Sequence, residues 1–113
     1  MASVVILRES PSPEQLNELL SVLGTLIKLA VDIRREVIAA GGEMHYDCEQ
    51  ALLDDGSLQE DVWGADWEPA SGTVRFESLI NIRPRQSNFK LEIQDPQRRA
   101  EVERVVRRIF EGT

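Results

Sequence analysis

The chain has 113 residues, of which 42% are hydrophobic and 29% charged, and its formal net charge is -7 at pH 7. These values are typical of one soluble globular domain over residues 1–113, and the negative charge argues against nucleic acid and membrane as partners. The chain has a single Cys, no signal-peptide pattern and no apolar run long enough to span a bilayer, so we expect a cytoplasmic protein without disulfides.

The charges are unevenly distributed along the chain. Between Val37 and Val74 there are nine acidic residues and no Lys or Arg, whereas basic residues outnumber acidic ones from Arg75 onward. Two interpretations follow from this pattern. The two halves either face each other or are simply solvated, or they form an acidic cation-binding edge beside a basic anion-binding edge.

The first two predicted elements are a strand and a helix. Residues 4–7 form a short β-branched run that is typical of a buried strand. Ser12 can then cap a helix that has Pro13 at its first position, and four Leu residues follow at helical spacing. Gly24 is a natural end for this helix.

Residues 26–40 fit two patterns. Apolar residues alternate with polar or small ones over residues 27–34, which indicates a strand, although a helical stripe can also be drawn through the segment. β-Branched enrichment and the charged break at residues 34–36 favour a hairpin of two strands.

The next stretch, residues 41–49, contains the only His and the only Cys of the chain. If the second strand of the hairpin continues past the Gly pair, Glu43, His45 and Asp47 project from one face of it. Alternatively, Asp47 caps a short helix over residues 48–53.

The rest of the chain predicts three strands and a final helix. Residues 62–67 form a strand that places Trp63 and Trp67 on one face, most simply in the core, or else on a dimer surface or ligand platform. Alternation over residues 74–83 indicates a second strand, and residues 89–93 a short third one.

Asp95 and Pro96 begin the final helix, which Gly112 ends. Because strands and helices mix without a regular βαβ repeat, we expect an α+β fold. Its mostly antiparallel sheet would have about four to six strands, with two or three helices packed on one face.

The polar residues around the single His are the first candidate site. An imidazole and two carboxylates on one face can bind a divalent cation, or hold His45 as a general base. There is no second His and no strict metal motif, so the sequence assigns no metal ligand. The competing interpretation is structural: His45 bonds the backbone, Asp47 caps a helix and Glu43 faces water.

Cys48 has two readings as well. A position at a helix N-terminus lowers a thiol pKa and favours a nucleophile, whereas the flanking acids Asp47 and Glu49 oppose this. A buried, inert thiol is the simpler interpretation.

The second candidate site lies in the polar loop over residues 84–88. The preceding strand delivers Arg83 and Arg85 into this loop together with Gln86 and Asn88, an arrangement that suits a phosphate or a carboxylate. The alternative is that the Arg residues pair with the acidic middle of the chain.

These motifs resemble those of a family of short prokaryotic proteins known only as a domain of unknown function. The resemblance covers nearly the whole chain and is carried by Gly41-Gly42-Glu43-Met44-His45, Asp47, Glu49, Asp55-Gly56-Ser57-x-Gln59, Trp63-Gly64 and Ile80-Asn81-Ile82-Arg83-Pro84-x-Gln86-x-Asn88. Two residues depart from the pattern: Glu36, where a turn Gly is expected, and Tyr46, where a smaller residue is usual. The resemblance implies that the polar motifs form one site, and it implies no activity, substrate or cofactor.

The sequence therefore favours a non-catalytic binding or regulatory module for a small polar or anionic ligand or for a protein partner. We expect one ligand-binding pocket, lined by Glu43, His45, Asp47, Arg83, Gln86 and Asn88. One alternative is a metal-assisted hydrolase centred on His45 and nearby carboxylates. Another is a homodimeric structural or interaction protein that associates through a sheet face or edge.

Overall fold

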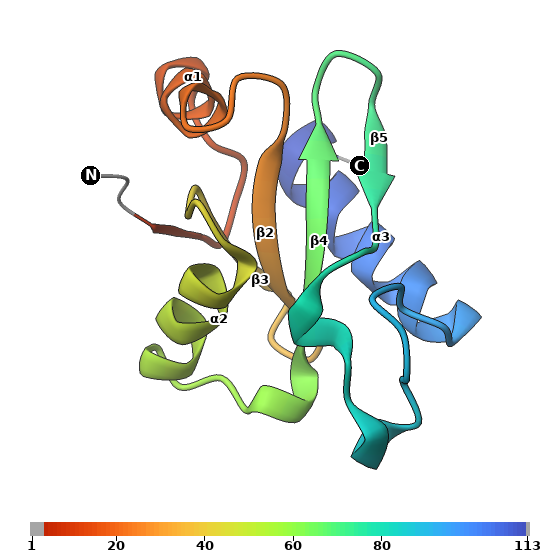
Figure 1. Cartoon of the computed structure of the whole chain (residues 1–113). Coiled ribbons are helices and arrows are strands. Elements are labelled where there is room, and N and C mark those ends of the chain that lie inside the picture. Colours follow the sequence, from red (N-terminus) through yellow and green to blue (C-terminus); the bar gives the residue numbers. More distant parts are fainter. Residues whose placement is uncertain (1–3, 113) are drawn as a thin grey trace.

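The computed structural model describes residues 4–112 as a five-stranded antiparallel sheet with three α-helices, which confirms the expected α+β class (Figure 1). The strand order across the sheet is β1-β3-β2-β4-β5. The elements in chain order are β1 (Val5–Leu7), α1 (Pro13–Ser21), β2 (Ile27–Asp32), β3 (Val37–Ala40), α2 (His45–Asp54), the 3-10 helix η1 (Gln59–Asp61), β4 (Val62–Glu68), β5 (Thr73–Arg75), the 3-10 helices η2 (Leu79–Asn81) and η3 (Pro84–Gln86), and α3 (Pro96–Glu111).

The hairpin expected over residues 26–40 is confirmed as β2 and β3, which pair antiparallel. Asp32 shapes its turn, because its carboxylate Oδ1 accepts hydrogen bonds from the main-chain N–H groups of Arg34 and Arg35 at 2.9 and 2.8 Å. Glu36 occupies the left-handed position of this turn with a φ of 58°. This backbone conformation favours Gly. The Glu36 carboxylate accepts a hydrogen bond from Arg104 of α3 at 3.0 Å, and this contact helps to hold Glu36 in the turn.

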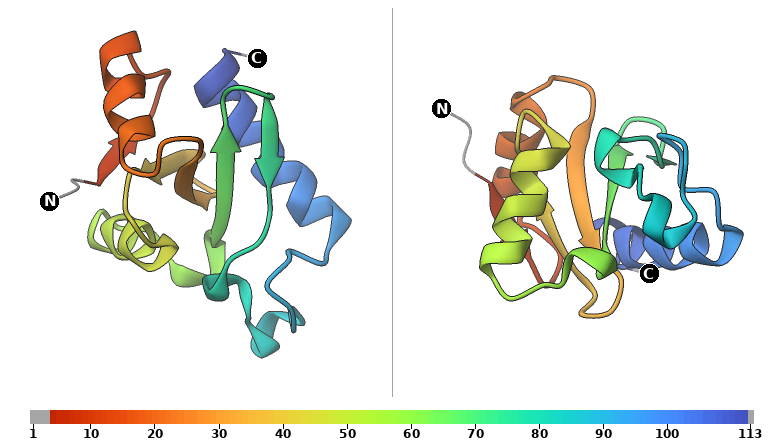
Figure 2. Two further views of the ribbon diagram at one scale, coloured as in Figure 1. Left: turned by 45° about the horizontal axis from the view of Figure 1, so that its top comes forward. Right: turned by 60° about the horizontal axis from the view of Figure 1, so that its bottom comes forward.

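The helices cover both faces of the sheet, rather than the one face that was expected (Figures 1 and 2). The larger core joins α1 and α3 to one face of the sheet, and it includes Trp63 and Trp67, as expected from the alternation in β4. Trp67 stacks on Phe110 of α3 with 5.7 Å between ring centroids. The opposite face is covered by α2, whose buried Cys48 and Leu52 pack in a second cluster with Ala30, Val37, Ala39 and Val62.

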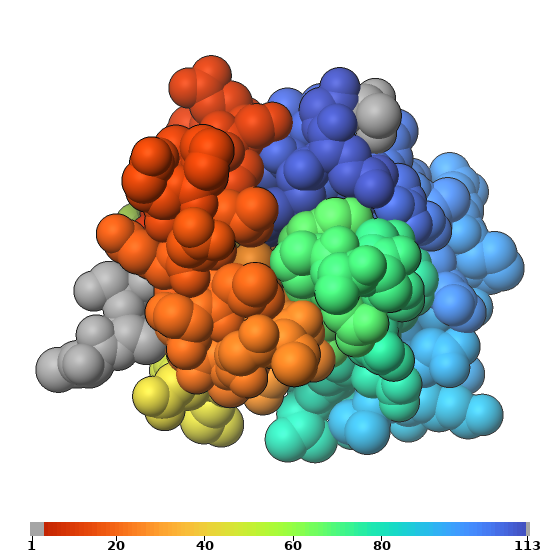
Figure 3. Space-filling model, turned by 90° about the horizontal axis from the view of Figure 1, so that it is seen from above, coloured from red at the N-terminus to blue at the C-terminus, as the bar shows by residue number. Residues whose placement is uncertain are grey.

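One end of the molecule brings α1 beside the C-terminal part of α3 (Figure 3). Leu16 and Leu20 of α1 and Phe110 of α3 all pack against the larger core. The apolar side chains from which these two helices were predicted therefore pack into the same core. Among residues 4–112, no helix combines the length and the apolar character needed to cross a membrane.

One predicted strand is much shorter than expected, and another is absent from the described residues. The strand expected over residues 74–83 stops at Arg75, where β5 ends, and the chain turns into η2. Residues 89–93 form no strand and contact the segment after β5 through one isolated bridge, Glu77 with Glu92. The expected alternation of buried and exposed residues holds as far as Ile80. It then reverses in and after η2, where Asn81 and Arg83 are buried and Ile82 is exposed.

Candidate functional site

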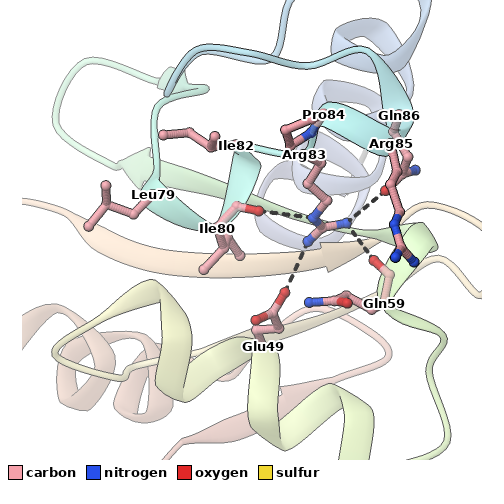
Figure 4. A pocket seen from close by; sticks show the side chains of 9 residues that line it. All are labelled: Glu49, Gln59, Leu79, Ile80, Ile82, Arg83, Pro84, Arg85 and Gln86. Atoms are coloured by element: carbon pink, nitrogen blue, oxygen red, sulfur yellow. Dashed lines mark hydrogen bonds and ion pairs between the residues drawn. The ribbon is translucent and has the colours of Figure 1, made fainter.

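Two adjoining hollows separate α2 from residues 78–86, and together they form what we call the groove. The His45 hollow has a volume of about 460 Å³ and is lined by Lys28, Met44, His45, Tyr46, Ser78, Leu79 and Ile80. The Arg83 hollow has a volume of about 440 Å³ and is lined by Glu49, Gln59, Leu79, Ile80, Ile82, Arg83, Pro84, Arg85 and Gln86 (Figure 4). The hollows share Leu79 and Ile80, so they are parts of one continuous surface.

The N-terminus of α2 forms one wall of the groove and corrects the first site prediction. Met44 is the N-cap with extended backbone, and the helix begins at His45 instead of continuing the strand. Gly42 permits this close turn, since a Cβ there would lie 3.1 Å from the Cβ of Asp47. Glu43, His45 and Asp47 therefore do not share a strand face. The alternative helix start at Cys48 is also wrong, because α2 begins three residues earlier.

His45 reaches from α2 to β4. Its Nε2 lies 2.8 Å from Asp66 Oδ1 and 3.1 Å from the carbonyl oxygen of Ala65. Both neighbours are acceptors, so Nε2 is the donor of these contacts. The His45 and Asp66 side chains are only 12% and 13% exposed, and their contact fixes the start of α2 on the sheet. Glu43 and Asp47 are exposed and line neither hollow.

Arg83 joins the two walls of the groove (Figure 4). Its Nη2 donates to Glu49 Oε2 at 2.9 Å, its Nη1 to the carbonyl oxygen of Gln59 at 2.5 Å, and its Nε to that of Ile80 at 3.0 Å. Its guanidinium also lies 4.7 Å from the centre of the Trp63 ring. Burial lowers the pKa of Arg83 from its usual value, and the Glu49 carboxylate acts in the opposite direction. The prediction that the loop Arg residues pair with the acidic middle of the chain thus holds for Arg83.

The other predicted loop residues differ in their surroundings. Gln86 lines the Arg83 hollow and donates from Nε2 to the carbonyl oxygen of Glu60 at 2.9 Å. Arg85 lines the same hollow but is exposed, and its guanidinium makes no hydrogen bond or ion pair within residues 4–112. Asn88 is fully buried outside both hollows, where its Nδ2 donates to three main-chain carbonyl groups. The structure therefore brings His45, Arg83 and Gln86 to one groove and places Asn88 inside the loop that follows it.

Asn81 and Gly64 shape the groove from beneath. Asn81 Oδ1 accepts from the Gly64 N–H at 2.8 Å, and its Nδ2 donates to the Gly64 carbonyl oxygen at 3.0 Å, so the side chain pairs with β4 as a neighbouring strand would. A Cβ on Gly64 would lie 2.6 Å from the Cβ of Ser78. Gly at this position is what allows η2 to approach β4. A Gly inside a predicted strand is the sequence signal for such an approach.

Sequence reasoning missed the apolar side chains of the groove. Leu79 is 74% exposed, and Met44, Tyr46 and Ile82 are exposed beside it. Leu79 does leave a signal, because it is the one apolar residue among the polar positions that alternate over residues 75–83. Met44 and Tyr46 leave none, since their exposure depends on where α2 begins.

Cys48 is buried beneath α2 and lines neither hollow. Burial raises the pKa of its thiol to about 11, and the S–H group lies 3.6 Å from the carbonyl oxygen of Lys28. The thiol is therefore placed as a packing group, in agreement with the simpler of its two readings. Within residues 4–112, no three His, Cys, Asp or Glu side chains are grouped so that they could hold a metal ion.

Comparison with known proteins gives a family and nothing more specific. No curated protein and no solved structure matches the chain. A family model described as protein of unknown function (DUF5674) matches residues 5–109, nearly the whole length. The chain therefore belongs to this family of proteins of unknown function.

Proposed function

We propose that the chain is a non-catalytic binding module whose binding surface is the groove between α2 and residues 78–86. The observation that carries this proposal is the concentration of exposed apolar side chains there. Residues 4–112 expose eight large apolar side chains, and four of them, Met44, Tyr46, Leu79 and Ile82, border the groove. Contiguous exposed apolar surface of this kind marks interaction sites in soluble proteins.

The groove is also held in shape before any ligand arrives. The Arg83–Glu49 ion pair spans it, with side chains only 9% and 5% exposed, and the His45–Asp66 contact fixes its other end. A surface that needs little ordering on binding retains more of its contact energy as affinity. Lys28 and Arg85, which have no ion pair within residues 4–112, add positive charge, and this supports a polar or anionic component in the ligand.

One contact favours a second candidate, a hydrolase. His45 donates from Nε2 to Asp66, and an imidazole oriented in this way by a carboxylate has the arrangement of a general base. Both groups lie at the His45 hollow or directly beneath it. A turnover assay of each ligand that binds separates this candidate from the first, because a binding module releases its ligand unchanged and a hydrolase cleaves it.

The proposal is tested by a thermal-shift screen with small carboxylates, phosphorylated metabolites and short peptides. Leu79→Asp places a charge in the groove, and Phe89→Asp is its matched control, because Phe89 is 65% exposed and lines neither hollow. A ligand at 100 times its Kd should stabilise the wild type and Phe89→Asp by about 2.7 kcal/mol, a shift of several degrees, and Leu79→Asp by much less.

Equal stabilisation of all three proteins would place the binding site elsewhere and contradict the proposal. Turnover of a bound ligand by the wild type but not by His45→Gln would support the hydrolase instead.

A further inference from the structure

We propose that the groove takes an acidic, apolar peptide segment from a partner protein. Apolar side chains of the segment would pack against Met44, Tyr46 and Leu79, and its carboxylates would meet Lys28 at one end and Arg85 at the other. This inference rests on the proposed function, since it names the class of ligand for the same groove.

The first argument is the state of the positive charges. The chain has 20 acidic and 13 basic side chains, so partners for cations are in excess. Nine Arg residues form ion pairs, and all 13 basic residues lie within the described part of the chain. The basic residues without an ion pair to any other residue of the described range, 4–112, are Lys28, Arg85, Lys90 and Arg98.

Two of these four residues line the groove. Arg98 already stacks on Trp63, with 4.2 Å between its guanidinium carbon and the ring centre, and Lys90 lies outside both hollows. Lys28 lines the His45 hollow and Arg85 lines the Arg83 hollow. Of the three cations with neither an ion pair nor a ring contact within residues 4–112, two therefore line this one groove, one in each hollow.

Within residues 4–112, neither of the two acids at the groove forms an ion pair with Lys28 or Arg85. Glu49 is paired with Arg83 at 2.9 Å, and Asp66 contacts His45 at 2.8 Å. Lys28 lies opposite Asp66 in the register of β2 and β4, yet no ion pair joins the two side chains. An incoming carboxylate can therefore form an ion pair with Lys28 or with Arg85 without displacing an ion pair of the chain. Such complementarity selects partners and fixes their register.

The positions of Lys28 and Arg85 indicate an extended ligand. The two residues line different hollows, which have only Leu79 and Ile80 in common. A compact anion would contact one of them, whereas a peptide chain, which advances by about 3.3 Å per residue, can run along α2 and contact both. The exposed Leu79 side chain lies between the two ends and provides the apolar contact in the middle.

The test uses peptides selected from a phage-displayed library of random 12-residue sequences on the folded protein. Affinities of the selected peptides are then measured by fluorescence polarisation for the wild type, Lys28→Gln, Arg85→Gln and Lys90→Gln. Each variant loses one positive charge, and Lys90 is the control because it is unpaired but lies outside the groove. We expect peptides that combine acidic and apolar residues, a loss of about three- to tenfold for Lys28→Gln and for Arg85→Gln, and less than a twofold change for Lys90→Gln.

Several outcomes would overturn the inference. Selected peptides without acidic residues would show that the ligand class is wrong, and so would an equal loss in Lys90→Gln. Failure to select any peptide would have the same meaning. A mass that doubles with concentration in the wild type and in Phe89→Asp, but not in Leu79→Asp, would show that a second copy of the chain occupies the groove.

These failures are distinguishable from failure of the proposed function. If a small carboxylate or phosphate stabilises the wild type but not Leu79→Asp while no peptide binds, the groove is a binding site and only its peptide ligand is refuted. Circular dichroism of each variant verifies that the charge changes leave the fold intact.

Discussion

Asn81 shows how a single side chain can substitute for a strand. Its amide satisfies both main-chain groups of Gly64 and also donates to the carbonyl oxygens of Phe76 and Leu91, at 3.2 Å each. Strand β4, which lies next to the edge strand β5, thereby gains a neighbour where β5 has already ended. Because Asn81 is fully buried, water cannot replace these hydrogen bonds.

We expect Asn81→Ala to lower the free energy of unfolding by about 2–4 kcal/mol, because it leaves buried donors and acceptors without partners. Urea denaturation followed by circular dichroism measures the change. Asn17→Ala is the matched control, since Asn17 is exposed on α1 and should change stability by less than about 0.5 kcal/mol. Similar values for the two variants would refute the role assigned to Asn81.

The same residues show the limit of prediction at this scale. Arg83 and Asn88 were expected to present donors to a ligand, and the sequence does identify them as a polar cluster. In the structure their N–H groups are directed mainly at main-chain carbonyl groups of the loops within residues 80–92, and one of them reaches the carbonyl group of Gln59, which is distant in sequence. Residue type and spacing predict that donors exist, but the path of those loops decides whether the donors face inward or toward a ligand.

Helix α2 is the element that connects the groove to the rest of the fold. Its start is held by the His45–Asp66 contact, its middle by the Glu49–Arg83 ion pair, and its C-terminal end by Asp55, which bonds Arg8 at 2.6 Å and Arg35 at 2.7 Å. Four separate parts of the chain therefore hold this one short helix in place. The alternation of residues 27–33 and the capped start of α3 predict their elements correctly, whereas the start of α2 has no side-chain cap and was misplaced.

Asp55 makes the stability of this attachment depend on pH. Hydrogen bonding by Arg35, and then the nearby charge of Arg8, lower the pKa of Asp55 below its usual value. A carboxylate with a lower pKa in the folded state stabilises the fold above its unfolded pKa of about 3.9, and this contribution is lost as the pH falls through the folded value. The difference in stability between the wild type and Asp55→Asn should therefore shrink as the pH falls from about 5 to 3.

Urea denaturation of the wild type and Asp55→Asn at several pH values measures this difference. Asp54→Asn is the matched control, because Asp54 is exposed and has no ion pair within residues 4–112. If the difference in stability between the wild type and Asp55→Asn stays constant over this range, the charge of Asp55 does not stabilise the fold through its ion pairs.

At the scale of the whole molecule, the sheet joins two cores that do not touch each other. Strand β2 contributes Leu29 and Val31 to the larger core and Ala30, which lies between them, to the cluster under α2. Successive side chains of a strand point to opposite faces of the sheet, so each shared strand connects the larger core to the cluster under α2. The sequence predicts the composition of the larger core well, since the helical stripes and the β4 alternation are regular. It does not predict the second core, because small residues such as Ala39 give little indication that a helix covers them.

This coupling predicts that the chain unfolds as one domain, in a single step. Leu52 of α2 is fully buried in the smaller core, so Leu52→Ala should lower the free energy of unfolding by about 2–5 kcal/mol. Trp63 and Trp67 lie in the other core, yet their fluorescence should report the same shifted transition as circular dichroism, because the strands between the cores are shared. Leu58→Ala, at an exposed position, should shift neither signal. If circular dichroism instead shows an early loss of helix while Trp fluorescence keeps its wild-type midpoint, α2 unfolds separately, and the groove wall that it forms would be a mobile surface rather than a fixed one.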